Sequence, residues 1–232
     1  MNNWHAPQRP NDYAEHALVQ AILDGRYPPG SPLPAERALA VQLGVTRPTL
    51  REALQRLARD GWLTVQQGKS TTVNDFWRDG GLNVLGTLVY YPEHLPPGFV
   101  GHLLAVRLDL APAYTRTAVA QAAAAVAAFV GGYAGLAEET AVYATFDWQL
   151  HRHLTQQSGN PIYGLILNGF ADFYQQLAAQ YFQSQAARAH SHAFYAALHD
   201  AALSQDPAQA EQIARQAMAE SIQHWKQLGV DS

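Results

Sequence analysis

The sequence predicts a mainly α-helical protein, with an N-terminal winged helix-turn-helix domain that carries a small β-hairpin wing and a C-terminal all-α antiparallel helical bundle. Three observations support this fold class: three helical periods before residue 61, a hairpin pattern over 62–75, and helical periodicity through the rest of the chain. A length of 232 residues suffices for two cores. We predict a winged helix-turn-helix domain over 1–75, a linker over 76–92 and a second, all-helical domain over 93–232.

The first two helices are short and end at turn residues. In "NDYAEHALVQAILDG" the apolar residues recur at helical spacing, with Asn11 or Asp12 as the cap and Gly25 as the stop. A stiff connector, "YPPGSPLP", follows. "AERALAVQLG" then predicts a short helix that opens after Pro34 and closes at Gly44.

The third helix has a complete set of local signals. Thr46 stands where an N-cap belongs, and its hydroxyl can accept from the amide of Thr49. Pro48 in the first turn removes a donor that has no intrahelical partner, and Gly61 ends the helix. One face carries an apolar stripe that predicts a core contact: Leu50, Ala53, Leu54 and Leu57.

The wing and the charge distribution point to a polyanionic partner. "WLTVQQGKSTTVND" alternates in the manner of two strands around the turn "QQGKS". Residues 28–72 carry six basic and three acidic side chains, a net charge of +3, whereas residues 76–232 carry seven and twelve, a net charge of −5. A basic N-terminal part on an acidic body indicates that only the first domain meets a polyanion.

Arg47, Arg51 and Arg56 lie on the third helix. A solvated helix face is the plain alternative. Their position after "LGVT", with Lys69 on a nearby glycine wing, favours DNA binding. Arginine presents a planar fork of donors to O6 and N7 of guanine, so these side chains would read bases. A helix-turn-helix normally binds double-stranded DNA as a dimer on a two-fold symmetric operator, so we expect a homodimer.

The segment "PPGSPLPAERALAVQLGVTRPTLREALQRLARDGWL" resembles the winged-helix signature of the GntR family of bacterial transcription regulators. "LPAERALA", "GVTRPTLREALQRLARDGWLTVQQGKSTTVNDFW" and "SGNPIYGLILNGF" are similar to its fatty-acid-responsive branch, over residues 12 to 228. The resemblance implies a regulator of fatty-acid metabolism that represses degradation genes, activates synthesis genes and leaves its operator when long-chain acyl-CoA binds.

The resemblance also implies which residues contact DNA. The arginines would read bases, the threonines would meet phosphates and the tip of the wing would enter the minor groove. Pro48 and Gln67 depart from the hydroxylated residue and the histidine that are usual in this branch. The implied DNA-binding residues are Arg37, Thr46, Arg47, Thr49, Arg51, Gln67, Gly68 and Lys69.

For the effector domain, the resemblance implies acyl-CoA contacts from Arg107, Tyr181, Glu220, Ser221 and Trp225. The alternative for Arg107, a charge within an apolar helix, is an ion pair with an acid such as Asp147 or Asp172.

Packing is the alternative for the other effector residues. Glu220, Ser221 and Trp225 could form a helix-packing seam, and the aromatic stripe from Phe170 to Tyr181 is usually core. Val230 replaces a basic residue of this branch, and Lys226 stands nearby.

A metal with a small carboxylate effector is the alternative for this kind of domain. Asp147 and His151 at i and i+4, with His192 or His199, could begin a metal site, but Ala219 stands at the final position. We therefore expect no metal and no cofactor.

An enzyme is the other class to weigh. The chain has no cysteine and no glycine-rich phosphate loop, and Glu220 with His224 is the only candidate pair for acyl-CoA hydrolysis. We expect no catalytic residue. The apolar run over 118–137 is mostly alanine and glycine, which favours a packed bundle helix over a membrane span. The first residues lack an apolar signal-peptide region, so we expect a cytoplasmic protein without a membrane partner.

Overall fold

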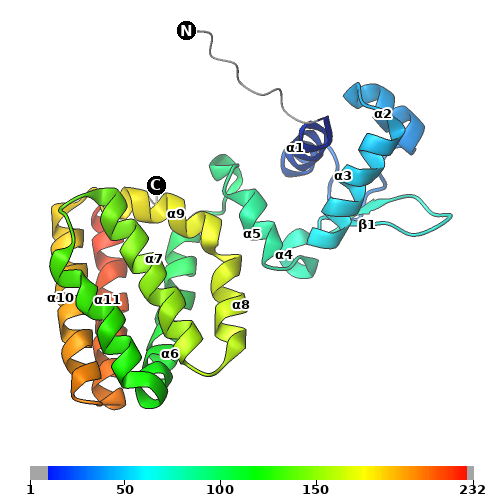
Figure 1. The fold of residues 1–232 in the computed structure, drawn as a ribbon. Helices are drawn as coiled ribbons and strands as arrows, with labels where there is room; N and C mark the ends of the chain where they lie inside the picture. Colours follow the sequence, from blue (N-terminus) through cyan, green and yellow to red (C-terminus); the bar gives the residue numbers. More distant parts are fainter. Residues whose placement is uncertain (1–9, 229–232) are drawn as a thin grey trace, which may run out of the picture. The chain divides into compact units, whose positions relative to one another are not determined.

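The computed structural model describes residues 10–228. Two compact units divide at residues 94 and 95. Figure 1 shows both, with the helix-turn-helix elements in blue and cyan and the bundle from green to red. The predicted fold class is confirmed: the described part is mainly helical, with one two-stranded sheet.

The N-terminal unit holds the winged helix-turn-helix. The elements are α1 Pro10–Leu23, α2 Glu36–Leu43, α3 Arg47–Asp60, β1 Leu63–Thr64, β2 Thr72–Val73, α4 Phe76–Asp79, α5 Asn83–Leu88 and the 3-10 turn η1 Pro92–His94. The strands are antiparallel, with Leu63 opposite Val73. The segment 76–92, which we predicted as a linker, therefore contains α4 and α5 and belongs to this compact unit.

The recognition helix α3 forms as predicted. The hydroxyl of Thr46 accepts from the amide of Thr49, and Gly61 ends the helix at φ 95°. The predicted stripe from Leu50 to Leu57 is buried. By contrast, α1 begins at Pro10, so Asn11 lies inside the helix instead of capping it. Proline favours the first helical turn because its fixed φ suits a helix and its missing N–H has no intrahelical partner there.

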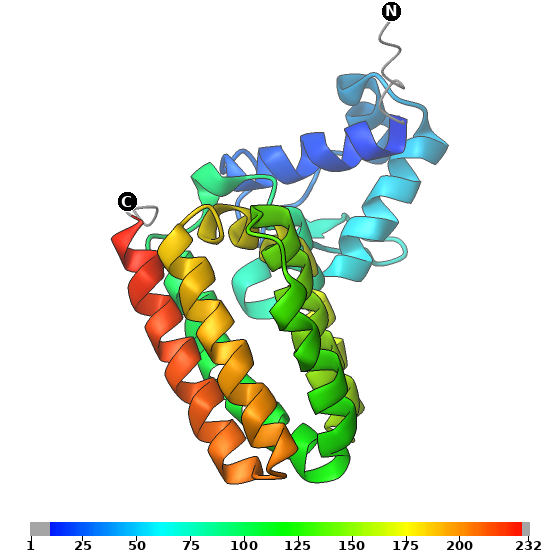
Figure 2. The ribbon, with the colours of Figure 1, turned by 60° about the vertical axis from the view of Figure 1, so that its left-hand side comes forward.

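The C-terminal unit is a bundle of α6 Phe99–Val130, the 3-10 turn η2 Gly131–Gly135, α7 Thr140–Gln157, α8 Pro161–Gly169, α9 Ala171–Tyr181, α10 Gln185–Leu203 and α11 Pro207–Gln227. Figure 2 shows α6, α10 and α11 side by side. Side chains that the sequence places before each helix cap three of them: Asn160, Ser184 and Asp206.

Two features of the bundle differ from the periodicity. The helical periodicity of the sequence continues through 161–183, but in the structure this segment divides at Phe170, directly after Gly169, into α8 and α9. Glycine weakens the helix at this point because it has the most backbone freedom to lose. α6 also contains a non-helical residue, Ala122, at φ −144° and ψ 44°.

The segment Phe99–Gly135 is long and apolar enough to cross a membrane by length and composition alone. In the structure one of its faces is buried, including Ala118 and Val126, and it packs against α7, α10 and α11. This packing agrees with the expectation of a bundle helix.

Candidate functional site

The recognition helix exposes two of its arginines beside one acid. Arg51 donates from Nε to Glu36 Oε2 over 2.7 Å, and a terminal nitrogen of Arg47 lies 3.8 Å from the same oxygen. Both arginine side chains are more than half exposed. Glu36 on α2 therefore holds two solvent-facing guanidinium groups at the start of α3, where a recognition helix contacts base edges.

The two threonines at this helix start form a small hydroxyl pair. The hydroxyls of Thr46 and Thr49 lie 2.8 Å apart, and the Thr49 amide donates to Thr46 over 3.3 Å. Thr46 is exposed. Each hydroxyl can accept and donate, so this pair can cap the helix and still donate to a phosphate oxygen.

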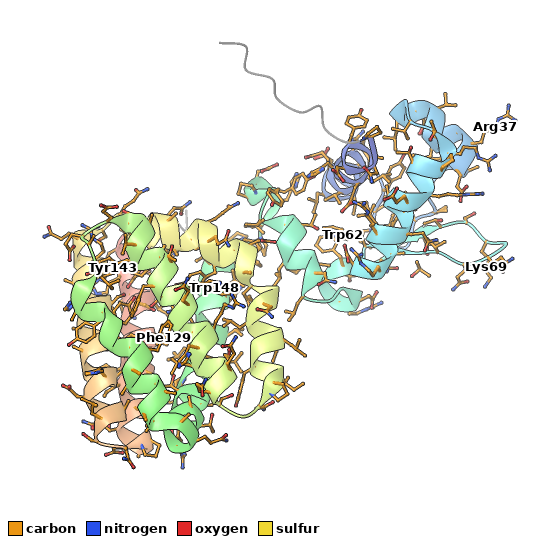
Figure 3. The ribbon with its side chains drawn as sticks, viewed as in Figure 1. Arg37, Trp62, Lys69, Phe129, Tyr143 and Trp148 are labelled. Carbon is orange, nitrogen blue, oxygen red and sulfur yellow. The ribbon has the colours of Figure 1, made fainter. Side chains whose placement is uncertain are left out.

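The remaining predicted DNA contacts belong to α2 and the wing. Arg37 and Lys69 both point away from the body of the N-terminal unit (Figure 3). Gln67, Gly68 and Lys69 are exposed at the turn between β1 and β2. Gly68 has φ 74°, a conformation that strongly favours glycine, so the tight wing tip depends on this residue.

Arg56 lies apart from this group. Its guanidinium contacts Asp12, Glu15 and Glu52 at 3.1, 3.6 and 2.8 Å. The prediction that the arginines of this helix read bases does not extend to Arg56, because it links α3 to α1. Helical spacing places Glu52 beside Arg56 on α3, but it could not show the contacts with Asp12 and Glu15, because these acids come from α1.

The C-terminal unit contains a largely apolar pocket. Its cavity volume is ≈ 120 Å³. The lining comes from α6 to α11, and side chains of α6, α8 and α9 contribute most of its apolar part. The polar side chains in the lining are Arg107, Tyr114, Asp147, His151, Tyr163, Tyr174, Tyr181, His190, Ser191 and Ser221.

A charged network lies in this pocket. A terminal nitrogen of Arg107 contacts Asp147 Oδ2 at 3.1 Å and His151 Nε2 at 2.7 Å. The ion pair that we weighed as an alternative for Arg107 is therefore present, and Arg107 also lines the pocket. The two interpretations are compatible, because a ligand oxygen could reach a guanidinium that keeps its counter-ion.

Asp147 receives further hydrogen bonds. Tyr174 donates to its Oδ2, and Tyr195 donates to its Oδ1 over 2.9 Å. Burial alone would raise the pKa of this carboxyl, but His151, Arg107 and the tyrosine hydroxyls together lower it. Asp147 is therefore an ionised carboxylate at the centre of the bundle.

The tautomer of His151 follows from its neighbours. Arginine can only donate, so Nε2 of His151 must accept from Arg107, and Nδ1–H then donates to the Tyr114 hydroxyl at 2.7 Å. Burial, followed by the charge of Arg107, lowers the pKa of His151 to about 4. The imidazole is therefore neutral at physiological pH.

Tyr181 is a polar lining residue whose hydroxyl lacks a hydrogen-bond partner among the described residues. This hydroxyl is buried. Burial raises the pKa of this phenol, so it remains a neutral donor. A buried unpaired hydroxyl is costly, and a ligand oxygen in the pocket would satisfy it.

The last helix divides the predicted effector residues. Ser221 and Trp225 are buried and line the pocket, and the Ser221 hydroxyl donates to the carbonyl of Met218 over 2.7 Å. Glu220 lies beside the pocket and contacts His190 at 3.2 Å. Val230 lies outside the described residues.

The residues weighed for a metal site lie in different surroundings. Within residues 10–228, His, Asp and Glu side chains do not gather in a group of three that could hold a metal. His192 and His199 lie against the ring of Tyr133, and the charged group beside Asp147 and His151 is Arg107.

Sequence reasoning missed several residues of this site. Tyr114, Tyr195 and His190 were not predicted to lie there, although Tyr114 follows Arg107 by seven residues and so shares its helix face. The aromatic stripe from Phe170 to Tyr181, which is usually core, lines the pocket.

Comparisons with known proteins agree with both units. Residues 10–73 match the profile of bacterial regulatory proteins of the gntR family, and residues 74–231 match the FadR C-terminal domain. The chain belongs to the GntR family of bacterial transcription regulators. Within this family, its helical part is a FadR-type domain.

Curated relatives share most of the chain. A "Fatty acid metabolism regulator protein" of Shewanella frigidimarina is 42% identical over 222 residues, which cover 96% of this chain and 93% of the relative. A protein of the same name from Edwardsiella ictaluri is 45% identical over 197 residues, which cover 85% of this chain and 82% of the relative.

A solved structure supports the fold. The structure titled "Lar controls the expression of the Listeria monocytogenes agr system and mediates virulence" matches 97% of this chain and 99% of its own, with 16% identity and a TM-score of 0.57. At this identity the likeness concerns the fold alone.

Proposed function

We propose that the protein is a cytoplasmic, homodimeric regulator of fatty-acid metabolism genes that is released from its operator by long-chain acyl-CoA. It represses degradation genes and activates synthesis genes. The observation that carries this proposal is the apolar pocket of the FadR-type domain, with the buried hydroxyl of Tyr181 and the guanidinium of Arg107 in its lining. Such a pocket suits a long apolar chain with one polar group to orient it.

The DNA half of the proposal rests on the face formed by α3, α2 and the wing. Arg37, Arg47, Arg51 and Lys69 give it positive charge, and α3 offers the side chains that reach base edges. Two copies would place two recognition helices in successive major grooves, about 34–36 Å apart on a palindromic site.

The segment 74–92 is our candidate for the lever between effector and DNA. Within the N-terminal unit, the Asn83 side chain donates to Asp60 at the end of α3 over 3.3 Å, and the Asn74 side chain donates to the carbonyl of Gly61 over 3.0 Å. A shift of this segment would therefore reach the recognition helix directly. Effector binding then favours a dimer geometry that no longer matches the operator.

A fluorescence anisotropy titration tests both halves. A labelled palindromic operator is first saturated with protein and then titrated with oleoyl-CoA, with octanoyl-CoA and free CoA as controls. We expect release by oleoyl-CoA alone, and recovery of intact acyl-CoA afterwards. Tight DNA binding that no acyl-CoA disturbs would contradict the effector assignment and leave the DNA assignment standing.

A second measurement tests the coupling. Binding free energies are linked, so operator DNA must weaken acyl-CoA binding by the factor with which acyl-CoA weakens DNA binding. Calorimetry of oleoyl-CoA with and without saturating operator measures this factor. Identical affinities in both titrations would show that the two sites are not coupled.

A further inference from the structure

His190 on α10 lies beside α11 with both ring nitrogens next to acceptors. Nδ1 is 3.2 Å from Glu220 Oε2, and Nε2 is 3.2 Å from the carbonyl oxygen of Ala217. The side chain is 14% exposed, and it lines the pocket. This position combines solvent access for protons with direct contact to the pocket interior.

The two contacts favour the protonated ring. A neutral imidazole has one N–H, so one nitrogen would face an acceptor oxygen with a lone pair, which is repulsive. The imidazolium donates from both nitrogens and satisfies the carboxylate and the carbonyl together. The same charge neutralises Glu220, whose Oε1 already accepts from the Gln216 side chain over 2.8 Å.

A positive charge on His190 would also offset the negative charge of Glu220 beside the pocket. An unpaired carboxylate beside the pocket would repel the phosphates of a coenzyme A group, since like charges at short range disfavour each other. With His190 protonated, the pair carries no net charge. An anionic headgroup could then lie against it without this repulsion.

We propose that protonated His190 is a positioning residue for the effector, which neutralises Glu220 so that the anionic headgroup of an acyl-CoA thioester can lie beside the pocket. This inference rests on the proposed function. It follows that acyl-CoA affinity should be greater with a charged His190 ring than with a neutral one. Histidine is suited to this because its charge changes between about pH 5 and 8.

Other titratable groups lie near this position. The ring of His224 on α11 lies 5.0 Å from that of His190. Tyr181 on α9 is a phenol whose pKa burial raises. Across the pocket, the charged and titratable groups form the mutually bonded network Arg107, Asp147 and His151.

The test is calorimetric titration of the full-length protein with oleoyl-CoA at about pH 6 and about pH 8, across the range in which histidine loses its charge. The variants are His190→Leu, which removes the ring nitrogens, and Glu220→Gln, which removes the charge that His190 neutralises. The matched control is His102→Leu, an exposed histidine of α6 outside the pocket lining.

We expect the affinity of the unmodified protein and of the His102→Leu control to fall about three- to tenfold more between these pH values than that of His190→Leu. At about pH 8, Glu220→Gln should bind more tightly than the unmodified protein, because it has no unpaired carboxylate to repel the headgroup. At about pH 6, His190→Leu should bind more weakly than the unmodified protein, and at about pH 8 the two should be equal. The phosphates of the ligand also titrate, with a pKa near 6, but this effect is common to all four proteins.

Thermal unfolding identifies any variant that fails to fold, and Glu220→Gln, which keeps His190, provides an independent comparison. Equal pH dependence in the unmodified protein and folded His190→Leu, or unchanged affinity of Glu220→Gln at about pH 8, would overturn the role of His190 while leaving the proposed function intact. Failure of the unmodified protein to bind oleoyl-CoA at either pH would overturn the proposed function itself.

Discussion

Arg51 on the recognition helix donates from Nε to Glu36 Oε2 on α2 over 2.7 Å. This contact uses the nitrogen nearest the stem of the side chain, and Glu36 is the acid paired with Arg51 among the described residues. The terminal nitrogens, which form the fork that suits guanine, are thus held in orientation by a carboxylate behind them. The pair joins both helices of the helix-turn-helix.

Replacing Glu36 with Gln should raise affinity for DNA and reduce discrimination. Loss of one negative charge near phosphates strengthens binding to any sequence, whereas loss of the ionic contact to Arg51 frees its fork. We expect the preference for operator over scrambled DNA to narrow by about three- to tenfold. Anisotropy on both DNAs measures it, with Glu52→Gln, which faces Arg56, as the control. An unchanged preference would show that Glu36 does not orient Arg51.

Replacing Arg47 with Ala should cost about 1–3 kcal/mol more on the operator than on scrambled DNA, because a base contact is lost. Replacing Lys69 with Ala should weaken both similarly and reduce the dependence on salt, because a wing lysine mainly neutralises phosphate charge. Binding curves at several salt concentrations separate the two effects. Equal losses for Arg47 on both DNAs would reassign it to a phosphate.

Tyr181→Phe should separate folding from ligand binding. Its hydroxyl is buried without a partner among residues 10–228, so its removal should leave stability unchanged or slightly higher. If a ligand oxygen pairs with it, oleoyl-CoA affinity should fall by about 0.5–1.5 kcal/mol. Tyr195→Phe is the contrasting control: its hydroxyl donates to Asp147, so its loss should lower the free energy of unfolding. Undiminished affinity of Tyr181→Phe would remove this residue from the ligand site.

His151 should make stability depend on pH. Its pKa is lowered from 6.5 in the unfolded chain to about 4 in the folded protein, so the unfolded chain binds the proton first as pH falls. The free energy of unfolding should therefore decrease between about pH 6.5 and pH 4, by roughly 2–3 kcal/mol at about pH 4.5. Denaturation of the unmodified protein and of His151→Gln at about pH 6.5 and at about pH 4.5 measures this loss. A variant that retains the full decrease would show that other groups cause it.

Asp147 acts at lower pH. Its folded pKa is depressed, so its contribution to stability is fully present above the ordinary pKa of an aspartate. This contribution is lost as pH falls from that ordinary value through the lower pKa of the folded protein.

Replacing Arg107 with Met should destabilise the bundle by about 3–5 kcal/mol, because a buried carboxylate loses its counter-ion. Arg107→Met combined with Asp147→Asn should recover much of this loss in thermal unfolding. If the double variant were as unstable as the single one, packing instead of charge would explain the effect.

The sequence by itself determined the elements of the helix-turn-helix. The cap at Thr46, the stop at Gly61 and the buried stripe of α3 all follow from signals within a few residues of one another, and such local hydrogen bonds and periodicities do not depend on the rest of the fold. The division at Phe170 was missed because a single glycine is too weak a signal to end a helix in a predictable way.

The tertiary structure alone decided which side chains meet. Arg107 and Asp147 are separated by forty residues, and His190 and Glu220 by thirty, so spacing along the chain offers no measure of their contact. Likewise, the sequence contains eleven tyrosines, and only packing shows that the hydroxyl of Tyr181 is buried without a partner. Burial and long-range pairing arise only when separate helices pack together, and they in turn shift the pKa values of the ionisable groups in the pocket.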